Sequence, residues 1–279
     1  MKKDFVLNKA HLSYWLRQLR KTTDLIAPLR SENNEIIFSS VENIHEIALD
    51  CPASIPSPKE FLFPQKEEMF RFSGKGVEAS GNNGKRIIFG VRSCDISAIA
   101  LLDRFYGGSL EDNLYMNRRR NTAFISIVCS VPDPTCFCVG LGTGPFLKSG
   151  FDIQLTDLGD RYLAEVDSEK GLAMVRGFSH IFRKPVKADY DDQYEVNLSS
   201  QSKFEKRITL ENVRQKILAG EVKDPFWESV ALRCFECGGC VYECPLCTCF
   251  NVIDWKETGN KGTRMRVWDT CMFKGFTRM

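Results

Sequence analysis

The sequence lacks the features of secreted, membrane-spanning and nucleic-acid-binding proteins. Its basic start at residues 1–4 leads into a segment broken by Asn8, Lys9, His11 and Arg17, so neither a signal peptide nor a membrane span is expected. The 38 basic residues are nearly balanced by 36 acidic ones, for a formal net charge of +2. This balance gives no electrostatic basis for binding nucleic acid or an anionic membrane. We therefore expect a cytoplasmic protein without a nucleic-acid partner.

Signatures of common hydrolases are also missing. The only histidines are His11, His45 and His180, and none belongs to a constellation of acidic residues or cysteines. The sequence has no HExxH motif and no serine or cysteine nucleophile signature, which excludes the usual hydrolase classes. We assign no catalytic residue.

Cysteine is abundant, with twelve in the chain. Without a secretory signal, cysteines in a chain of this size are more often metal ligands than disulfide partners. Four of them, Cys234, Cys237, Cys240 and Cys244, follow the C-x2-C-x2-C-x3-C-P spacing of ferredoxins. Structural zinc uses paired C-x2-4-C units instead. The spacing predicts a [4Fe–4S] cluster at these four cysteines.

A βαβ unit is predicted in the middle of the chain. Residues 87–91 form an apolar run typical of a buried strand, and a helix capped by Asp95 follows from Ile96 to about Phe105. A second apolar run covers residues 123–128. Because the connection is a helical crossover, the two strands should be parallel.

This unit brings a second group of cysteines to one edge of the predicted sheet. Cys94 and Cys129 each follow the carboxyl end of a strand, and Cys136 and Cys138 lie in the loop that leaves the same edge. We predict a second [4Fe–4S] cluster at these four thiols. The alternative is that Cys94 and Cys129 are buried structural thiols. The G-x-G-x-G pattern at residues 140–144 is interpreted as a flexible turn.

Three further cysteines, Cys247, Cys249 and Cys271, remain near the carboxyl end. Two arrangements are open. Cys244 closes its own cluster, or it ligates a cluster elsewhere while one of these three takes its place. All three are also candidates for packed thiols without iron.

The predicted fold class is α+β with two domains. Residues 1–224 form an α/β-type domain, and residues 225–279 form a small, mostly helical ferredoxin-like segment. The proline-rich residues 51–64 predict a surface connection with one short helix, which is capped by Ser57. Polar residues between 189 and 203 are interpreted as a surface segment ahead of the boundary.

The cysteine pattern resembles the iron–sulfur family that contains the A-type subunits of anaerobic sulfite reductases and the sulfhydrogenase (hydrogenase) beta subunits. The similarity spans roughly residue 87 to the last residue. It rests on Arg92-Ser93-Cys94-Asp95, Cys129, Cys136-Phe137-Cys138-Val139, residues 234–249, Trp268-Asp269-Thr270-Cys271-Met272 and Gly275-Phe276.

The resemblance implies a cytoplasmic component of an anaerobic oxidoreductase complex that relays electrons without catalysing turnover alone. Its partners would be a flavin-containing NAD(P)H or ferredoxin oxidoreductase subunit and a catalytic reductase or hydrogenase subunit. The family continues past the matching residues 276–279 into a second ferredoxin motif, which this sequence does not contain. Either a separate chain supplies that motif, or the chain is a truncated or specialised form with fewer clusters. Two other interpretations are a zinc-stabilised interaction subunit and a cluster site that itself acts on a sulfur substrate.

Overall fold

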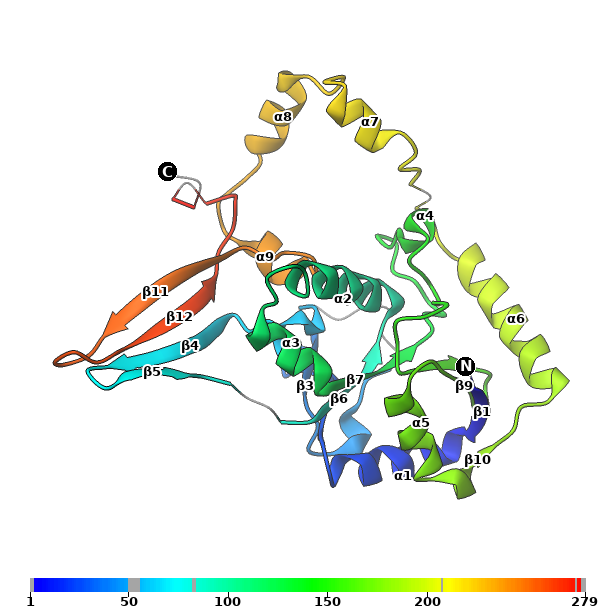
Figure 1. Ribbon diagram of the computed structural model, residues 1–279. Coiled ribbons are helices and arrows are strands. Elements are labelled where there is room, and N and C mark those ends of the chain that lie inside the picture. Colours follow the sequence, from blue (N-terminus) through cyan, green and yellow to red (C-terminus); the bar gives the residue numbers. More distant parts are fainter. Residues whose placement is uncertain (1–2, 50–55, 82–83, 207, 274, 277–279) are drawn as a thin grey trace.

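Two β-sheets organise the chain (Figure 1). The computed structural model describes residues 3–49, 56–81, 84–206, 208–273 and 275–276. The larger sheet has eight strands, which lie in the order β10 (Phe182–Arg183), β1 (Lys3–Asn8), β9 (Arg161–Val166), β8 (Ile153–Asp157), β7 (Thr122–Ile127), β6 (Arg86–Val91), β2 (Asp24–Arg30) and β3 (Ile36–Ser40). Four consecutive strands of this sheet, β8, β7, β6 and β2, are parallel to one another.

The predicted βαβ unit is confirmed, because β6 and β7 pair in parallel with Ile88 opposite Phe124. Its crossover contains two helices, α2 (Ser93–Tyr106) and α3 (Asn113–Arg120). The predicted cap at Asp95 is wrong, since α2 already begins at Ser93. The Asp95 carboxylate is buried and instead accepts a 3.0 Å hydrogen bond from Ser57 Oγ.

Apolar side chains cover both faces of the larger sheet. On one face, Trp15 of α1 (Lys9–Arg20) and Leu172 of α5 (Glu169–Arg176) pack on a cluster that includes Phe89. On the other face, Ile88 belongs to a cluster formed with α2, α3 and the segment around Phe63. The alternation of Ile88 and Phe89 between the two clusters explains why β6 is an uninterrupted apolar run.

The second sheet joins segments that are far apart in the sequence. Its order is β11 (Phe250–Lys256), β12 (Gly262–Trp268), β4 (Lys66–Ser73) and β5 (Gly76–Ala79). The α+β class is confirmed, but the expectation of a mostly helical carboxyl segment needs correction. In residues 225–279, β11 and β12 have seven residues each, which together exceed the residues of helices α8 (Asp224–Ala231) and α9 (Gly239–Glu243).

A buried ion network ties this second sheet to helix α3 of the βαβ crossover. Arg266 of β12 is 1% exposed and donates to Glu67 of β4 and to Asp112, which caps α3, each at 2.5 Å. Glu67 also pairs with Arg118 of α3. The Arg266 guanidinium lies 4.9 Å from the ring centroid of Phe63. The charges of Arg266, Glu67 and Arg118 are therefore paired with one another beside aromatic rings and are shielded from water.

The segment between the two cysteine-rich regions is helical. The polar residues from 189 to 203, interpreted as a surface segment, are mostly exposed. They belong mainly to α6 (Lys187–Ser202), a helix that the sequence did not predict. The Asp189 carboxylate anchors the first turn of this helix by accepting bonds from Val186 N, Arg161 and Arg183. Figure 1 shows α6, α7 (Val213–Leu218) and α8 (Asp224–Ala231) in an arch that leads to α9.

Short helices complete the fold: η1 (Ile44–Glu46), η2 (Pro58–Phe61), α4 (Cys138–Leu141) and η3 (Ser179–Ile181). The predicted cap at Ser57 is confirmed, because Ser57 Oγ accepts a bond from Lys59 N at the start of η2. Residues 51–55 of the predicted connection lie outside the described residues. Among the helices that are described, none combines the length and apolar character that crossing a membrane requires.

The buried network predicts a difference between two arginines of the same strand. Replacing Arg266 by Ala leaves the buried Glu67 short of a partner, which should lower the free energy of unfolding by about 3–5 kcal/mol. Arg264 pairs with Asp254 at the surface, so Arg264→Ala should have little effect. Denaturant unfolding followed by tryptophan fluorescence measures both. Equal stability losses in the two variants would contradict the structural role of the network.

Candidate metal centres

The first group of cysteines gathers at the amino end of α2. Cys94 lies in the first turn of α2, Cys129 follows β7, and Cys138 opens α4 with Cys136 two residues before it. The backbone N–H of Cys129 donates to Pro145 O at 3.2 Å, which draws the loop after α4 back to the strand end. The sheet edge and its exit loop thus bring these residues into one region, as the βαβ geometry requires.

The thiols of this region influence one another electrostatically. Desolvation, followed by the neighbouring Cys129 and Cys136, raises the pKa of Cys138 to about 11. Desolvation also raises the pKa of Cys94, with smaller contributions from Asp95 and Cys138. Without a bound cation, Cys94 and Cys138 are therefore protonated at neutral pH. Thiolates at these positions repel one another and need a cationic partner such as iron to neutralise their charge.

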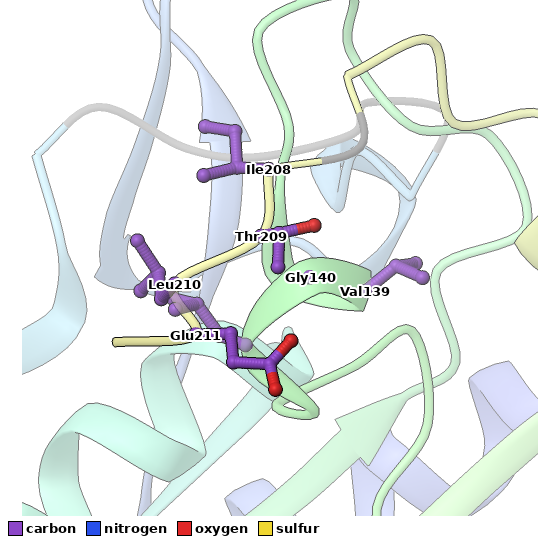
Figure 2. Close-up of a pocket in the computed structure, with 7 residues that line it drawn as sticks. Val139, Gly140, Ile208, Thr209, Leu210 and Glu211 are labelled. Atoms are coloured by element: carbon purple, nitrogen blue, oxygen red, sulfur yellow. The ribbon is translucent and has the colours of Figure 1, made fainter. Parts of the chain in front are cut away.

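Two glycines allow close packing around the loop that carries Cys138, and α4 covers the start of the expected flexible turn. A Cβ on Gly140 would collide with the Ile208 carbonyl oxygen. Figure 2 shows the 208–211 segment crossing α4 at this point. A Cβ on Gly144 would lie 2.8 Å from Cys138 Sγ and would collide with Ser93 Oγ. The backbone at Gly144 thus closely approaches a candidate iron ligand.

The pocket drawn in Figure 2 lies beside this site but offers little chemistry of its own. It is lined by residues 139–141 and 208–211, and Glu211 is the one ionisable residue of the described lining. Its walls hold neither a nucleophile–base pair nor a ligand set. We therefore interpret this pocket as a packing gap between α4 and the segment that follows α6.

The second group of cysteines lies on and around α9. Cys240 is in α9, and Cys234 and Cys237 precede it with exposed side chains. Cys240 Sγ lies 3.6 Å from Thr270 Oγ1, so the segment carrying Cys271 passes close to the ferredoxin-type motif. The exposure of these thiols leaves them accessible to iron.

The structure also gathers the three surplus cysteines. Asp269 N donates to Cys249 O at 3.1 Å, which holds the chain before Cys271 against the 247–249 loop. Desolvation raises the pKa of Cys249, the neighbouring Cys247 thiol adds to the increase, and a hydrogen bond with the Cys271 backbone opposes it. These three thiols therefore lie together rather than apart as isolated packed residues.

The described residues contain no group of three or more His, Cys, Asp or Glu side chains that would hold a single metal ion. A [4Fe–4S] cluster is bound differently, because it is held through four thiolates that ligate different irons. The cysteine-only donor sets, the open approach to Cys234 and Cys237 and the close backbone at Gly144 fit such a cluster. The individual ligand assignments stay predictions.

The two cysteine regions lie at opposite ends of α2. Ser97 Oγ contacts Thr143 O at 3.5 Å near one end, and Tyr106 Oη contacts Thr248 O at 3.5 Å at the other. Figure 1 accordingly shows α4 and α9 beside opposite ends of this helix. With 14 residues, α2 is about 21 Å long.

A second connection between the regions runs through η2, and no sequence motif indicates it. Ser57 bonds Asp95, the neighbour of Cys94, while Lys59 Nζ donates to Val241 O at 2.6 Å and to Cys244 O at 2.8 Å. The cap and one residue of a single short helix therefore contact both cysteine regions. In the sequence, Lys59 is a single lysine ahead of the apolar residues that begin at Phe61, and this pattern alone does not indicate a link to the cysteines.

Comparison with known proteins identifies the family. A family model described as a 4Fe-4S dicluster domain matches residues 233–279. Sulfhydrogenase 2 subunit beta of Pyrococcus furiosus is 33% identical over 266 residues, which cover 94% of this chain and 78% of that protein. The chain belongs to the sulfhydrogenase beta subunit family. It is an iron–sulfur subunit of the hydrogenase or reductase class, and its carboxyl region is of the 4Fe–4S type.

In an iron–sulfur subunit, the close packing of Gly144 against Cys138 predicts that Gly144 is needed for iron binding. Gly144→Ala should displace Cys138, because the added Cβ cannot stay 2.8 Å from its sulfur. We expect the iron content of anaerobically purified protein to fall by about four atoms per chain, one cluster. Gly108→Ala is the matched control, since its Cβ meets nothing closer than 3.6 Å. Full iron content in Gly144→Ala would argue against a cluster at Cys138.

Proposed function

We propose that the chain relays single electrons between two partner subunits of an oxidoreductase complex. The observation that carries the proposal is the placement of two cysteine-only regions at the two ends of α2, each with at least one exposed cysteine. The described residues contain no catalytic constellation beside them. A protein with two such regions and no substrate chemistry of its own is suited to electron transfer.

The proposed ligands follow the two regions. Cys234, Cys237, Cys240 and Cys244 hold one [4Fe–4S] cluster, and Cys94, Cys129, Cys136 and Cys138 hold a second. Cys247, Cys249 and Cys271 are available to complete a further cluster or to replace Cys244. Hydrogen bonds to the cluster sulfurs, burial and local charge would set the potentials.

The proposed partners are a flavin-containing NAD(P)H or ferredoxin oxidoreductase subunit on one side and a catalytic reductase or hydrogenase subunit on the other. The surface around Cys234 supports docking of another protein. Phe235 is 93% exposed, Leu232 is 88% exposed, and Trp227 of α8 is also exposed. Such apolar side chains beside a redox site are typical of an interface with a protein partner. A chain supplying a second ferredoxin motif would be a third partner.

A cytoplasmic location is proposed from the state of the cysteines. None of the eleven that the structure describes is in a disulfide; the twelfth, Cys51, lies outside the described residues. Thiols in this number suit a reducing compartment, where they stay available to iron.

Iron and sulfide analysis of anaerobically purified protein tests the proposal. The protein should contain both elements and give an EPR signal after dithionite reduction. Cys240→Ala should lose about four iron atoms per chain. Cys51→Ala is the matched control, because the sequence assigns no iron to Cys51, and it should retain its iron.

Two other results would replace the proposal. Zinc in place of iron would make the chain a structural or interaction subunit whose cysteines only stabilise the fold. Reduction of sulfur compounds by the isolated chain would assign catalysis to one of the cluster sites, with the solvent-exposed Cys94 region as the first candidate.

A further inference from the structure

Lys59 is a fully buried lysine whose side chain ends at the ferredoxin-type cysteine loop. Its relative exposure is 0%. The Nζ donates to Val241 O at 2.6 Å, to Cys244 O at 2.8 Å and to Cys247 O at 3.4 Å. It also lies 4.2 Å from the ring centroid of Trp268. The loop of residues 241–247 therefore wraps around one ammonium group.

The contacts of Lys59 Nζ match the three donors of an ammonium group. An ammonium has three N–H donors, one for each of the three carbonyls, whereas a neutral amine has only two. The Trp268 ring adds a cation–π contact that favours the charged form. The hydrogen bonds and ring contact described for Nζ include no carboxylate. A buried charge without a counter-ion is costly.

An iron–sulfur cluster bound by this loop would supply the negative charge that balances the Lys59 ammonium. Cys244 and Cys247, whose carbonyls accept from Lys59, are candidate ligands in the same loop, and a thiolate-ligated cluster gains one negative charge with each electron. A nearby ammonium in a poorly hydrated site stabilises the reduced cluster more than the oxidised one. It therefore makes reduction more favourable.

We propose that Lys59 is a positioning residue that shapes the 241–247 loop and raises the reduction potential of the cluster bound there. The inference rests on the proposed function, since it requires a cluster at this loop. It adds that a residue of the amino-terminal domain, far from the cysteine motif in sequence, adjusts the potential of the carboxyl-terminal cluster. The ammonium acts through the backbone and its charge, without ligating iron.

Redox titration followed by EPR tests the proposal on the full chain. Lys59→Met keeps the length of the side chain but removes the charge. Reduction should become at least tenfold less favourable, which corresponds to a downward shift of about 59 mV for a one-electron couple. Lys59→Arg should recover much of the shift because it restores the charge. Lys256→Met, at an exposed position in β11, is the control and should leave the potential unchanged.

Each outcome decides the proposal. A Lys59→Met protein with full iron and an unchanged potential would overturn it. If this variant does not retain iron, Lys59→Gln is titrated in its place. If both neutral variants lose iron and Lys59→Arg does not, the result supports a requirement for positive charge at this position. Loss of iron in all three variants would overturn the proposal. Absence of iron from the unmodified protein would instead refute the proposed function itself, so the two failures are distinguishable.

Discussion

The pairing of β12 with β4, sealed by the buried Arg266–Glu67–Arg118 network, is the interaction on which the arrangement of the cysteine regions depends. It fixes the carboxyl-terminal strands to a hairpin that belongs to the first third of the chain. Because the charges are enclosed by Phe63 and its aromatic neighbours, partial separation would expose unpaired ions to an apolar environment. The α9 region is thereby held at one end of α2 and not left on a mobile tether.

This fixed placement suits a protein that transfers electrons. The region of Cys94 and the region of Cys240 are joined by α2 and, independently, by residues 57–59. Membership in the sulfhydrogenase beta subunit family and the 4Fe–4S type of the carboxyl region agree with such a role. A rigid separation would keep the electronic coupling between the two proposed clusters constant.

The sequence predicted features whose signals are local in the chain. The ferredoxin spacing is contained in twelve residues, and the strands of the βαβ unit are continuous apolar runs. Helix α6 is not evident in the sequence because it has almost no apolar face, and its first turn is held by side chains outside the helix, Arg161 and Arg183, which bind Asp189. Lys59 was missed because its partners are backbone carbonyls 182 to 188 residues away, which have no side-chain signature.

The distance along the chain between β4 and β12 has a consequence for biosynthesis. Glu67 and Arg266 are 199 positions apart, so at ribosomal speeds of 5–20 residues per second β4 waits roughly 10–40 s for its neighbour. During that interval one edge of the β4–β5 hairpin is open to pairing with foreign strands. Nascent chains should therefore depend on a chaperone at this hairpin until β12 has been synthesised.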